Sequence, residues 1–108
     1  MTSNFRVLGA GVWGLAFSDY LLKLGHNVEI FCRDTNLSNK NISGLKLSHV
    51  SDKNLVSLDT LNAQKSNGEI NIIAVNSKGF SDLLNKHESY FSTLDEWVSL
   101  TKGLDHIS

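Results

Sequence analysis

Three glycines lie within six residues near the start of the chain, at Gly9, Gly11 and Gly14. This G-x-G-x-x-G spacing often serves turn geometry alone, but between a strand and a helix each glycine has its own task. The first permits a tight turn, the second leaves room for a pyrophosphate beside the backbone, and the third lets the helix pack closely on the sheet. The first N–H groups of that helix would then face the phosphates. The pattern predicts a dinucleotide site if the flanking segments have the required structure.

The segments on either side of the glycines meet this condition. Residues 5–8 form a short β-prone run, and Gly25 is a suitable residue to end a helix that follows the turn. Residues 27–32 predict a second strand. Between these elements, apolar side chains recur at helical spacing and predict one buried helix face. That face would consist of Trp13, Ala16, Phe17, Tyr20, Leu21 and Leu24. The order of strand, glycine turn, helix and strand defines a βαβ unit.

The rest of the chain continues this alternation less clearly. Residues 34–54 are polar and predict a long loop with at most a short helix. Further strands are predicted at 55–58, 70–75 and 97–100. A short helix that Asp59 would cap is predicted to run to about Lys65, and another helix follows Ser77. The run 70–75 is apolar at nearly every position, so we expect it inside the sheet. We therefore expect an α/β fold in which residues 1–108 form one doubly wound, mainly parallel Rossmann-type domain.

Composition excludes several other classes of protein. The 108 residues are 41% hydrophobic and 19% charged, which is ordinary globular composition and not that of a disordered chain. The formal charge of −1 provides no basic field for nucleic acid. No apolar stretch approaches the roughly 20 residues of a membrane span, and the N-terminus does not have the pattern of a signal peptide. The single cysteine, Cys32, excludes an internal disulfide and fits a reducing cytoplasm. The four histidines are scattered, so we expect no metal site.

Several segments in order resemble bacterial NAD(P)-dependent glycerol-3-phosphate dehydrogenase. They are residues 9–16 (GAGVWGLA), 25–28 (GHNV), 33–34 (RD), 44–47 (GLKL), 72–77 (IIAVNS) and 98–105 (VSLTKGLD). The family typically has G-A-G-S-W-G-T-A-L-A, G-H-x-V, G-R-D, P-G-I-K-L, A-V-P-S and V-S-A-T-K-G-I-E at these places. The segment Thr101-Lys102-Gly103 discriminates most, because a generic Rossmann domain does not require it. The resemblance covers nearly the whole chain.

The departures from the family pattern concern hydroxyls, prolines and length. Val12 stands where the family usually has serine, Asn76 where it has proline, and Ser43 and Ser48 where it has loop prolines. The sequence ends at Ser108. In the family, a helical second domain supplies the catalytic lysine and most contacts to glycerol phosphate. We therefore expect a fragment or truncated product that binds the cofactor and does not turn over.

The resemblance also implies a reaction and a set of contacts. The intact family interconverts sn-glycerol 3-phosphate and dihydroxyacetone phosphate with NAD or NADP and feeds phospholipid synthesis. The implied cofactor-binding residues are Gly9, Gly11, Val12, Trp13, Gly14, Arg33, Phe80 and Lys102. Lys102 would also contact the substrate, and no catalytic residue is expected in this chain. Glycerol phosphate would be a partner only together with the second domain. A homodimer is one assembly that the resemblance allows, and the sequence does not decide the oligomeric state.

Four of these assignments have structural alternatives. The spacing of Trp13 also suits a helix core residue, and Phe80 could equally serve core packing. Lys102 could be a solvated lysine, and Arg33 could be an exposed loop cation. At the end of the second strand, an acid would favour NAD and an arginine the 2′-phosphate of NADP. Alignment with related domains puts Cys32 there, followed by Arg33, while Asp34 is the rival as a ribose ligand. Because of Arg33, we expect the chain at least to tolerate NADP(H).

Two other functions share the glycine turn. Ketopantoate reductases and hydroxyacid dehydrogenases begin in a similar way, but the Thr101-Lys102-Gly103 segment argues against them. A nucleotide-sensing module without catalysis is the alternative outside the enzymes.

Overall fold

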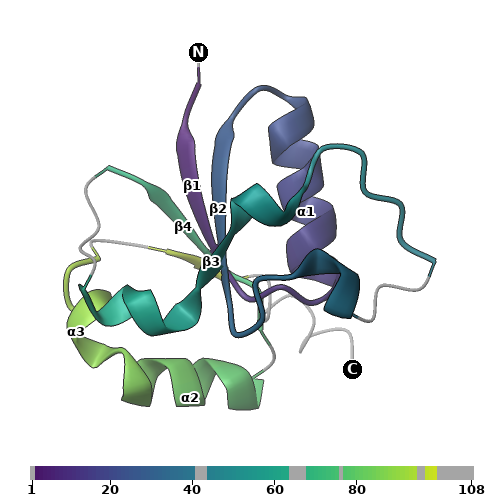
Figure 1. Cartoon of the computed structure of the whole chain (residues 1–108). Coiled ribbons are helices and arrows are strands. Elements are labelled where there is room, and N and C mark those ends of the chain that lie inside the picture. The colour runs from purple at the N-terminus through teal and green to yellow at the C-terminus, as the bar shows by residue number, and fades with distance from the viewer. Residues whose placement is uncertain (1, 41–43, 64–67, 76, 95–96, 100–108) are drawn as a thin grey trace.

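The computed structural model describes residues 2–40, 44–63, 68–75, 77–94 and 97–99. Within them, five strands form one parallel sheet in the order β3-β2-β1-β4-β5 (Figure 1). The strands are β1 (Asn4–Leu8), β2 (Asn27–Cys32), β3 (Leu55–Ser57), β4 (Ile70–Ile73) and β5 (Val98–Ser99). The helices are α1 (Val12–Lys23), α2 (Ser77–Lys86) and α3 (Glu88–Phe91), with 3₁₀ helices η1 (Leu37–Asn39), η2 (Asp52–Asn54) and η3 (Leu58–Ala63). The predicted Rossmann-type fold is confirmed.

The order of the strands reverses beside β1. The chain proceeds outward from β1 through β2 to β3, and then returns to the other side of β1 with β4 and β5. Ligands of such sheets bind outside the carboxyl ends of the strands at this switch point. The expected place of β4 inside the sheet is also confirmed, because β1 and β5 pair with it on either side.

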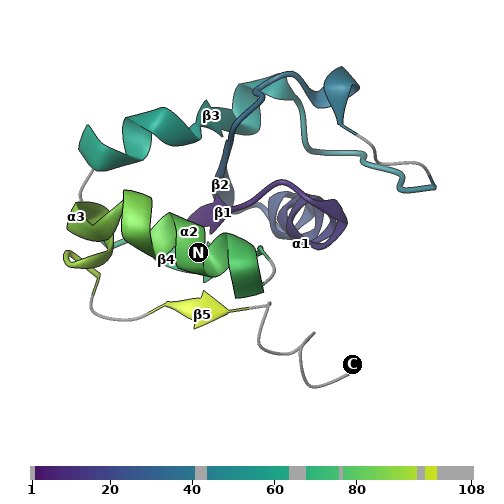
Figure 2. The same ribbon diagram turned by 90° about the horizontal axis from the view of Figure 1, so that it is seen from below.

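The two faces of the sheet have separate cores, since strand side chains alternate between faces. Helix α1 covers one face, and η3, α2 and α3 cover the other (Figure 2). The first core joins Val7, Ile30 and Ile72 to Leu15 and Leu21 of α1. The second core is formed by Leu8, Phe31, Ile73, Leu61, Leu83, Tyr90 and Phe91. Because both faces are covered, the middle strands are apolar at most positions.

The predicted apolar face of α1 is confirmed only in part, because Leu21 is buried and Phe17 packs against the first core while three of its members are exposed. Trp13, Tyr20 and Leu24 are 62%, 55% and 54% exposed. The buried residues of the helix are Gly14, Leu15, Ser18 and Leu21. A Cβ atom at Gly14 would lie against the carbonyl oxygen of Gly9 and 3.2 Å from Cβ of Ala74. This close approach turns Gly14 toward the sheet, and at about 100° per residue the buried side continues to Leu15 while Trp13 lies on the exposed side.

The ends of α1 and η3 test two further predictions. Gly25 ends α1 as expected: its φ is +94°, and the N–H groups of Gly25 and His26 donate to the carbonyls of Leu22 and Leu21 at 3.0 and 3.1 Å. Helix η3 begins at Leu58, so Asp59 lies in its first turn and does not precede it as predicted. In this first turn Thr60 Oγ1 donates to the carbonyl of Ser57 at 2.8 Å.

The long polar loop between β2 and β3 is held by side chains. It contains η1 and η2, in agreement with the expected loop with little helix. The carboxylate of Asp19 on α1 accepts three backbone N–H groups of this loop, from Ser48, His49 and Val50, at 3.0, 2.7 and 2.9 Å. These bonds attach the loop to α1.

Candidate functional site

The turn between β1 and α1 has a different requirement at each glycine. Gly9 has φ +119°, and a Cβ there would lie 2.6 Å from both the carbonyl oxygen of Ala74 and Cγ1 of Val75. Gly14 is equally confined, as described above. At Gly11, in contrast, a Cβ would meet nothing within 4 Å. Gly9 and Gly14 are therefore required by the fold, and the space beside Gly11 is open to a ligand.

Helix α1 begins at this turn with donors that its own side chains do not cap. Gly11 is the N-cap residue, and its carbonyl accepts the N–H of Leu15 at 2.9 Å. A glycine has no side-chain acceptor for the first N–H groups of the helix, which have no intrahelical partner. These donors and the positive end of the helix dipole suit an anionic group such as a pyrophosphate.

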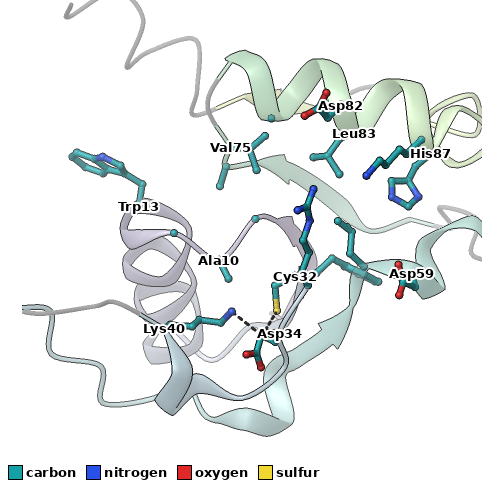
Figure 3. Close-up of a pocket in the computed structure, with 18 of the residues that line it drawn as sticks. Ala10, Trp13, Cys32, Asp34, Lys40, Asp59, Val75, Asp82, Leu83 and His87 are labelled. Carbon is teal, nitrogen blue, oxygen red and sulfur yellow. Dashed lines mark hydrogen bonds between the residues drawn. The ribbon is translucent and has the colours of Figure 1, made fainter.

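A cavity of about 1120 Å³ opens at the carboxyl ends of β1, β2 and β4. Its walls come from the glycine turn at 9–13, the end of β2 at 31–34, the end of β4 at 74–75, and parts of η3 and α2. Figure 3 shows Trp13 and Ala10 on the α1 side of this pocket and Leu83 and His87 on the α2 side. The volume is that of a small-molecule site.

The end of β2 places a thiol where related folds place an acid. Cys32 is buried, and its Sγ donates to the backbone carbonyl of Asp34 at 3.3 Å. Burial raises the pKa of the Cys32 thiol. The prediction of a buried structural cysteine is confirmed, and its neutral thiol is a poor acceptor for ribose hydroxyls.

Arg33 and Asp34, the two charged residues after β2, differ in the contacts that they make within the chain. The Asp34 carboxylate accepts the N–H of Asn36 through Oδ1 and the side-chain amide of Asn39 through Oδ2, both at 2.9 Å. The hydrogen bonds from Asn36 and Asn39 lower the pKa of Asp34. Arg33 is exposed and lines the cavity, and within the described ranges no hydrogen bond or ion pair engages its guanidinium.

The predicted cofactor residues are only partly brought together. Gly9, Gly11, Val12, Trp13 and Arg33 line the cavity. Gly14 lies beneath it as a packing residue. Phe80 does not line it: its ring packs edge-on against Phe91 and Trp97 at centroid distances of 6.4 Å. Its alternative role in core packing is therefore the one seen. Lys102 lies outside the described residues, as do Thr101 and Gly103.

Trp13 is not a core residue of α1. The sequence suggested that it could also be a core residue of the helix, but its side chain is largely exposed at the rim of the cavity. Contact with a ligand would involve its backbone N–H or the face of its ring.

Sequence reasoning missed two groups that the fold brings to this cavity. His87 is buried at the end of α2, and its Nδ1 lies 3.0 Å from Oδ1 of Asn62 on η3. Lys40 reaches the end of β2 from the polar loop, where its Nζ donates to the carbonyl of Asp34 at 2.7 Å. The helical spacing of His87 with Leu83 was the one available signal. Lys40 gave none, because its position depends on the fold of the loop.

The described residues also bear on metal binding and on membrane insertion. Within the described parts of the chain, no three or more His, Cys, Asp or Glu side chains are grouped closely enough to hold a metal ion. No helix among these residues combines the length and apolarity needed to cross a membrane.

The parallel sheet with its switch point, the glycine turn and the cavity across both define a Rossmann-type dinucleotide-binding protein. Within this class, a family model described as the N-terminus of NAD-dependent glycerol-3-phosphate dehydrogenase matches residues 4–108. The chain belongs to this family. The family expected from the sequence is confirmed, and with it a nicotinamide dinucleotide as the class of cofactor.

Individual relatives agree with the family match. The chain is 32% identical to glycerol-3-phosphate dehydrogenase [NAD(P)+] of Carboxydothermus hydrogenoformans, over 92% of this chain and 31% of the relative. It is 32% identical to the protein of that name from Thermoanaerobacter sp., over 94% of this chain and 32% of the relative. The corresponding protein of Alcanivorax borkumensis is 26% identical, over 94% and 31%. The chain thus spans about a third of the length of these relatives. No solved structure matches it.

Proposed function

We propose that this chain is the nucleotide-binding part of a glycerol-3-phosphate dehydrogenase and binds NAD(H) or NADP(H) across the switch point. The observation that carries the proposal is the open space at Gly11 beside the uncapped start of α1. It is supported by the family match over residues 4–108. In the intact enzyme, the cofactor would carry a hydride between sn-glycerol 3-phosphate and dihydroxyacetone phosphate, and the protein would supply orientation and charge.

Each contact in this proposal has a physical basis. The pyrophosphate would lie beside Gly11 and accept the N–H groups of Val12 and Trp13. The adenosine ribose would lie at the end of β2, where Arg33 would contact a 2′-phosphate and make NADP(H) acceptable. Contacts of Phe80 with the nicotinamide, and of Lys102 with cofactor and substrate, stay predictions from the family resemblance.

We further infer that these 108 residues alone bind cofactor without turnover. Relatives named glycerol-3-phosphate dehydrogenase are about three times as long, and the family resemblance assigns the catalytic lysine and most contacts to glycerol phosphate to a second domain. Substrate-dependent oxidation of NADPH by this chain would contradict the inference. A cytoplasmic location, supported by the single buried thiol, and a homodimer belong to the same proposal.

The test of binding uses Gly11, because its substitution separates ligand space from folding. Gly11→Val should abolish binding of NAD⁺ and NADP⁺ in calorimetric titrations while circular dichroism stays unchanged, since φ at this residue is −76° and a Cβ meets no protein atom. Tyr20→Val, at an exposed position on the same helix, is the matched control and should bind as the unaltered chain does. A folded Gly11→Val variant with retained affinity would show that the turn is only structural.

A further inference from the structure

We propose that Lys40 is a second determinant of cofactor specificity, which acts with Arg33 to bind the 2′-phosphate of NADP(H). The inference rests on the proposed function and adds to it a residue that neither the glycine motif nor the family segments include. Lys40 lies in the polar loop directly after η1, and its side chain lines the same cavity as Arg33.

The ammonium of Lys40 is held at the end of β2. Its Nζ donates to the backbone carbonyl of Asp34 at 2.7 Å, and the same carbonyl accepts Sγ of Cys32 at 3.3 Å. Figure 3 shows both bonds, with Lys40 directed from the loop toward Cys32 and Asp34 and with Ala10 of the glycine turn nearby. This is the part of the cavity where the adenosine ribose of a bound dinucleotide is expected.

The turn that carries Lys40 is organised by its own side chains. Both carboxylate oxygens of Asp34 accept hydrogen bonds from this turn, from the N–H of Asn36 and the amide of Asn39. The side chain of Asn36 in turn accepts the N–H of Ser38 at 3.0 Å. Leu37 is fixed from outside by the carboxylate of Asp52, which accepts its N–H at 2.7 Å. These hydrogen bonds therefore hold the turn, and with it Lys40, in a defined position.

These contacts also assign Asp34 a role other than ribose binding. Its carboxylate organises the turn, and its carbonyl orients the lysine. The residue at the end of β2 itself, Cys32, is a neutral buried thiol. Among the described residues at the end of β2, the one carboxylate is that of Asp34, and both of its oxygens already accept hydrogen bonds from the turn. An acid that is free to bind the ribose hydroxyls at this place is the feature that favours NAD.

The charge of Lys40 remains available to an anion. An ammonium has three donors, and the bond to the Asp34 carbonyl uses one of them. Among the residues that the structure describes, no carboxylate forms an ion pair with Lys40, and the Asp34 carboxylate interacts with its charge from a longer distance. The other acids on the cavity, Asp59 and Asp82, come from η3 and α2 (Figure 3). A phosphate would thus receive a planar fork from Arg33 and a point charge from Lys40, which is a suitable pair for its three oxygens.

The experiment compares NADP⁺ and NAD⁺ binding by calorimetry in variants of the whole chain. Lys40→Met removes the charge and keeps the stem, and we expect it to weaken NADP⁺ about three- to tenfold, because partial exposure reduces a charge-assisted contact to below its usual range. NAD⁺ should stay within about twofold, since it has no 2′-phosphate. Lys40→Arg should keep NADP⁺ within about threefold of the unaltered chain. Lys53→Met, in exposed η2 and outside the cavity, is the charge-matched control and should change neither affinity.

The outcomes separate this inference from the proposed function. If Lys40→Met leaves NADP⁺ unchanged, or weakens NADP⁺ and NAD⁺ equally, the inference is overturned while dinucleotide binding stands. If the unaltered chain binds neither nucleotide, the proposed function fails and this inference with it. A selective loss of NADP⁺ in Lys40→Met, with recovery in Lys40→Arg, supports both.

Discussion

Arg6, in the middle of β1, and Arg33, directly after β2, have the same side chain in opposite surroundings. Arg6 is only 8% exposed, with Nε 3.3 Å from Oε1 of Glu29 and Nη1 3.7 Å from Oε1 of Glu69. It also donates to the Tyr90 hydroxyl at 3.4 Å. Arg33 is exposed on the cavity wall, and the described part of the chain provides it with no ion pair.

This difference separates a charge that stabilises the fold from a charge that can bind a ligand. A buried charge must be paired and hydrogen-bonded, or the fold loses several kcal/mol. Arg6 fulfils this requirement with residues of β2, α3 and the segment before β4. Its guanidinium also lies 5.9 and 5.8 Å from the ring centroids of Phe31 and Tyr90. Arg33 is exposed, so its charge has no comparable desolvation cost, and its donors can bind an anion. We therefore expect substitutions at Arg6 and its partners, the first region, to change the stability of the fold. Substitutions at Arg33 on the cavity wall, the second region, should change nucleotide binding.

The largest effect should follow from Arg6→Met. The substitution leaves the carboxylate of Glu69 and the hydroxyl of Tyr90 without the buried cation. We expect the free energy of unfolding to fall by about 2–4 kcal/mol, somewhat below the range for fully buried pairs because Glu29 is half exposed. Urea denaturation measures it. Lys23→Met, at the exposed end of α1, is the control. A loss below about 1 kcal/mol would mean that the Arg6 contacts are as weak as surface pairs.

Arg33→Ala is the corresponding change in the second region. A charge-assisted contact of this kind is worth about 1.5–3 kcal/mol, so NADP(H) should bind roughly ten- to a hundredfold more weakly. NAD(H) should stay within a few fold, and the free energy of unfolding should not change. Matched titrations of Arg33→Ala and Asp34→Ala with both nucleotides decide the rival assignment. If only Asp34→Ala alters the ratio of NADP to NAD affinity, Asp34 and not Arg33 determines the preference.

Tyr90→Phe tests how much the neutral residues around Arg6 contribute to the free energy of unfolding. The Tyr90 hydroxyl donates to the side-chain oxygen of Asn71, which is buried in β4, and accepts from Arg6. Removing one oxygen should lower the free energy of unfolding by about 1–2 kcal/mol through the lost hydrogen bonds. Nucleotide affinities should stay within twofold. Altered NADP⁺ binding in this variant would contradict the separation of the two regions.

The same two regions show what could be predicted from the sequence. The glycine turn, the βαβ unit and Arg33 were accessible because their signals lie within about thirty neighbouring residues. The surroundings of Arg6 were not, because Tyr90 is 84 residues away in sequence. Lys40 was missed for a similar reason, since its place depends on side-chain contacts within an irregular loop. The buried face of α1 was predicted only in part because hydrophobic periodicity gives no weight to Gly14 and Ser18, where close packing decides which face is buried.

The smallest expected effect concerns His87, which lies where the second core meets the cavity. Burial lowers the pKa of His87 below its ordinary value near 6.5, so the fold favours the neutral ring that pairs with Asn62. Below about pH 6.5 the unfolded chain binds a proton that the folded chain binds less readily, so stability is full above this pH and falls as the pH decreases toward the folded pKa. We expect a loss below about 1 kcal/mol between pH 7.5 and 5.5 in urea titrations. His87→Gln should show a smaller loss over this range, while His26→Gln, directly before β2 and outside the cavity, should keep the loss of the unaltered chain. An equal pH dependence in all three proteins would mean that the His87–Asn62 contact does not control this titration.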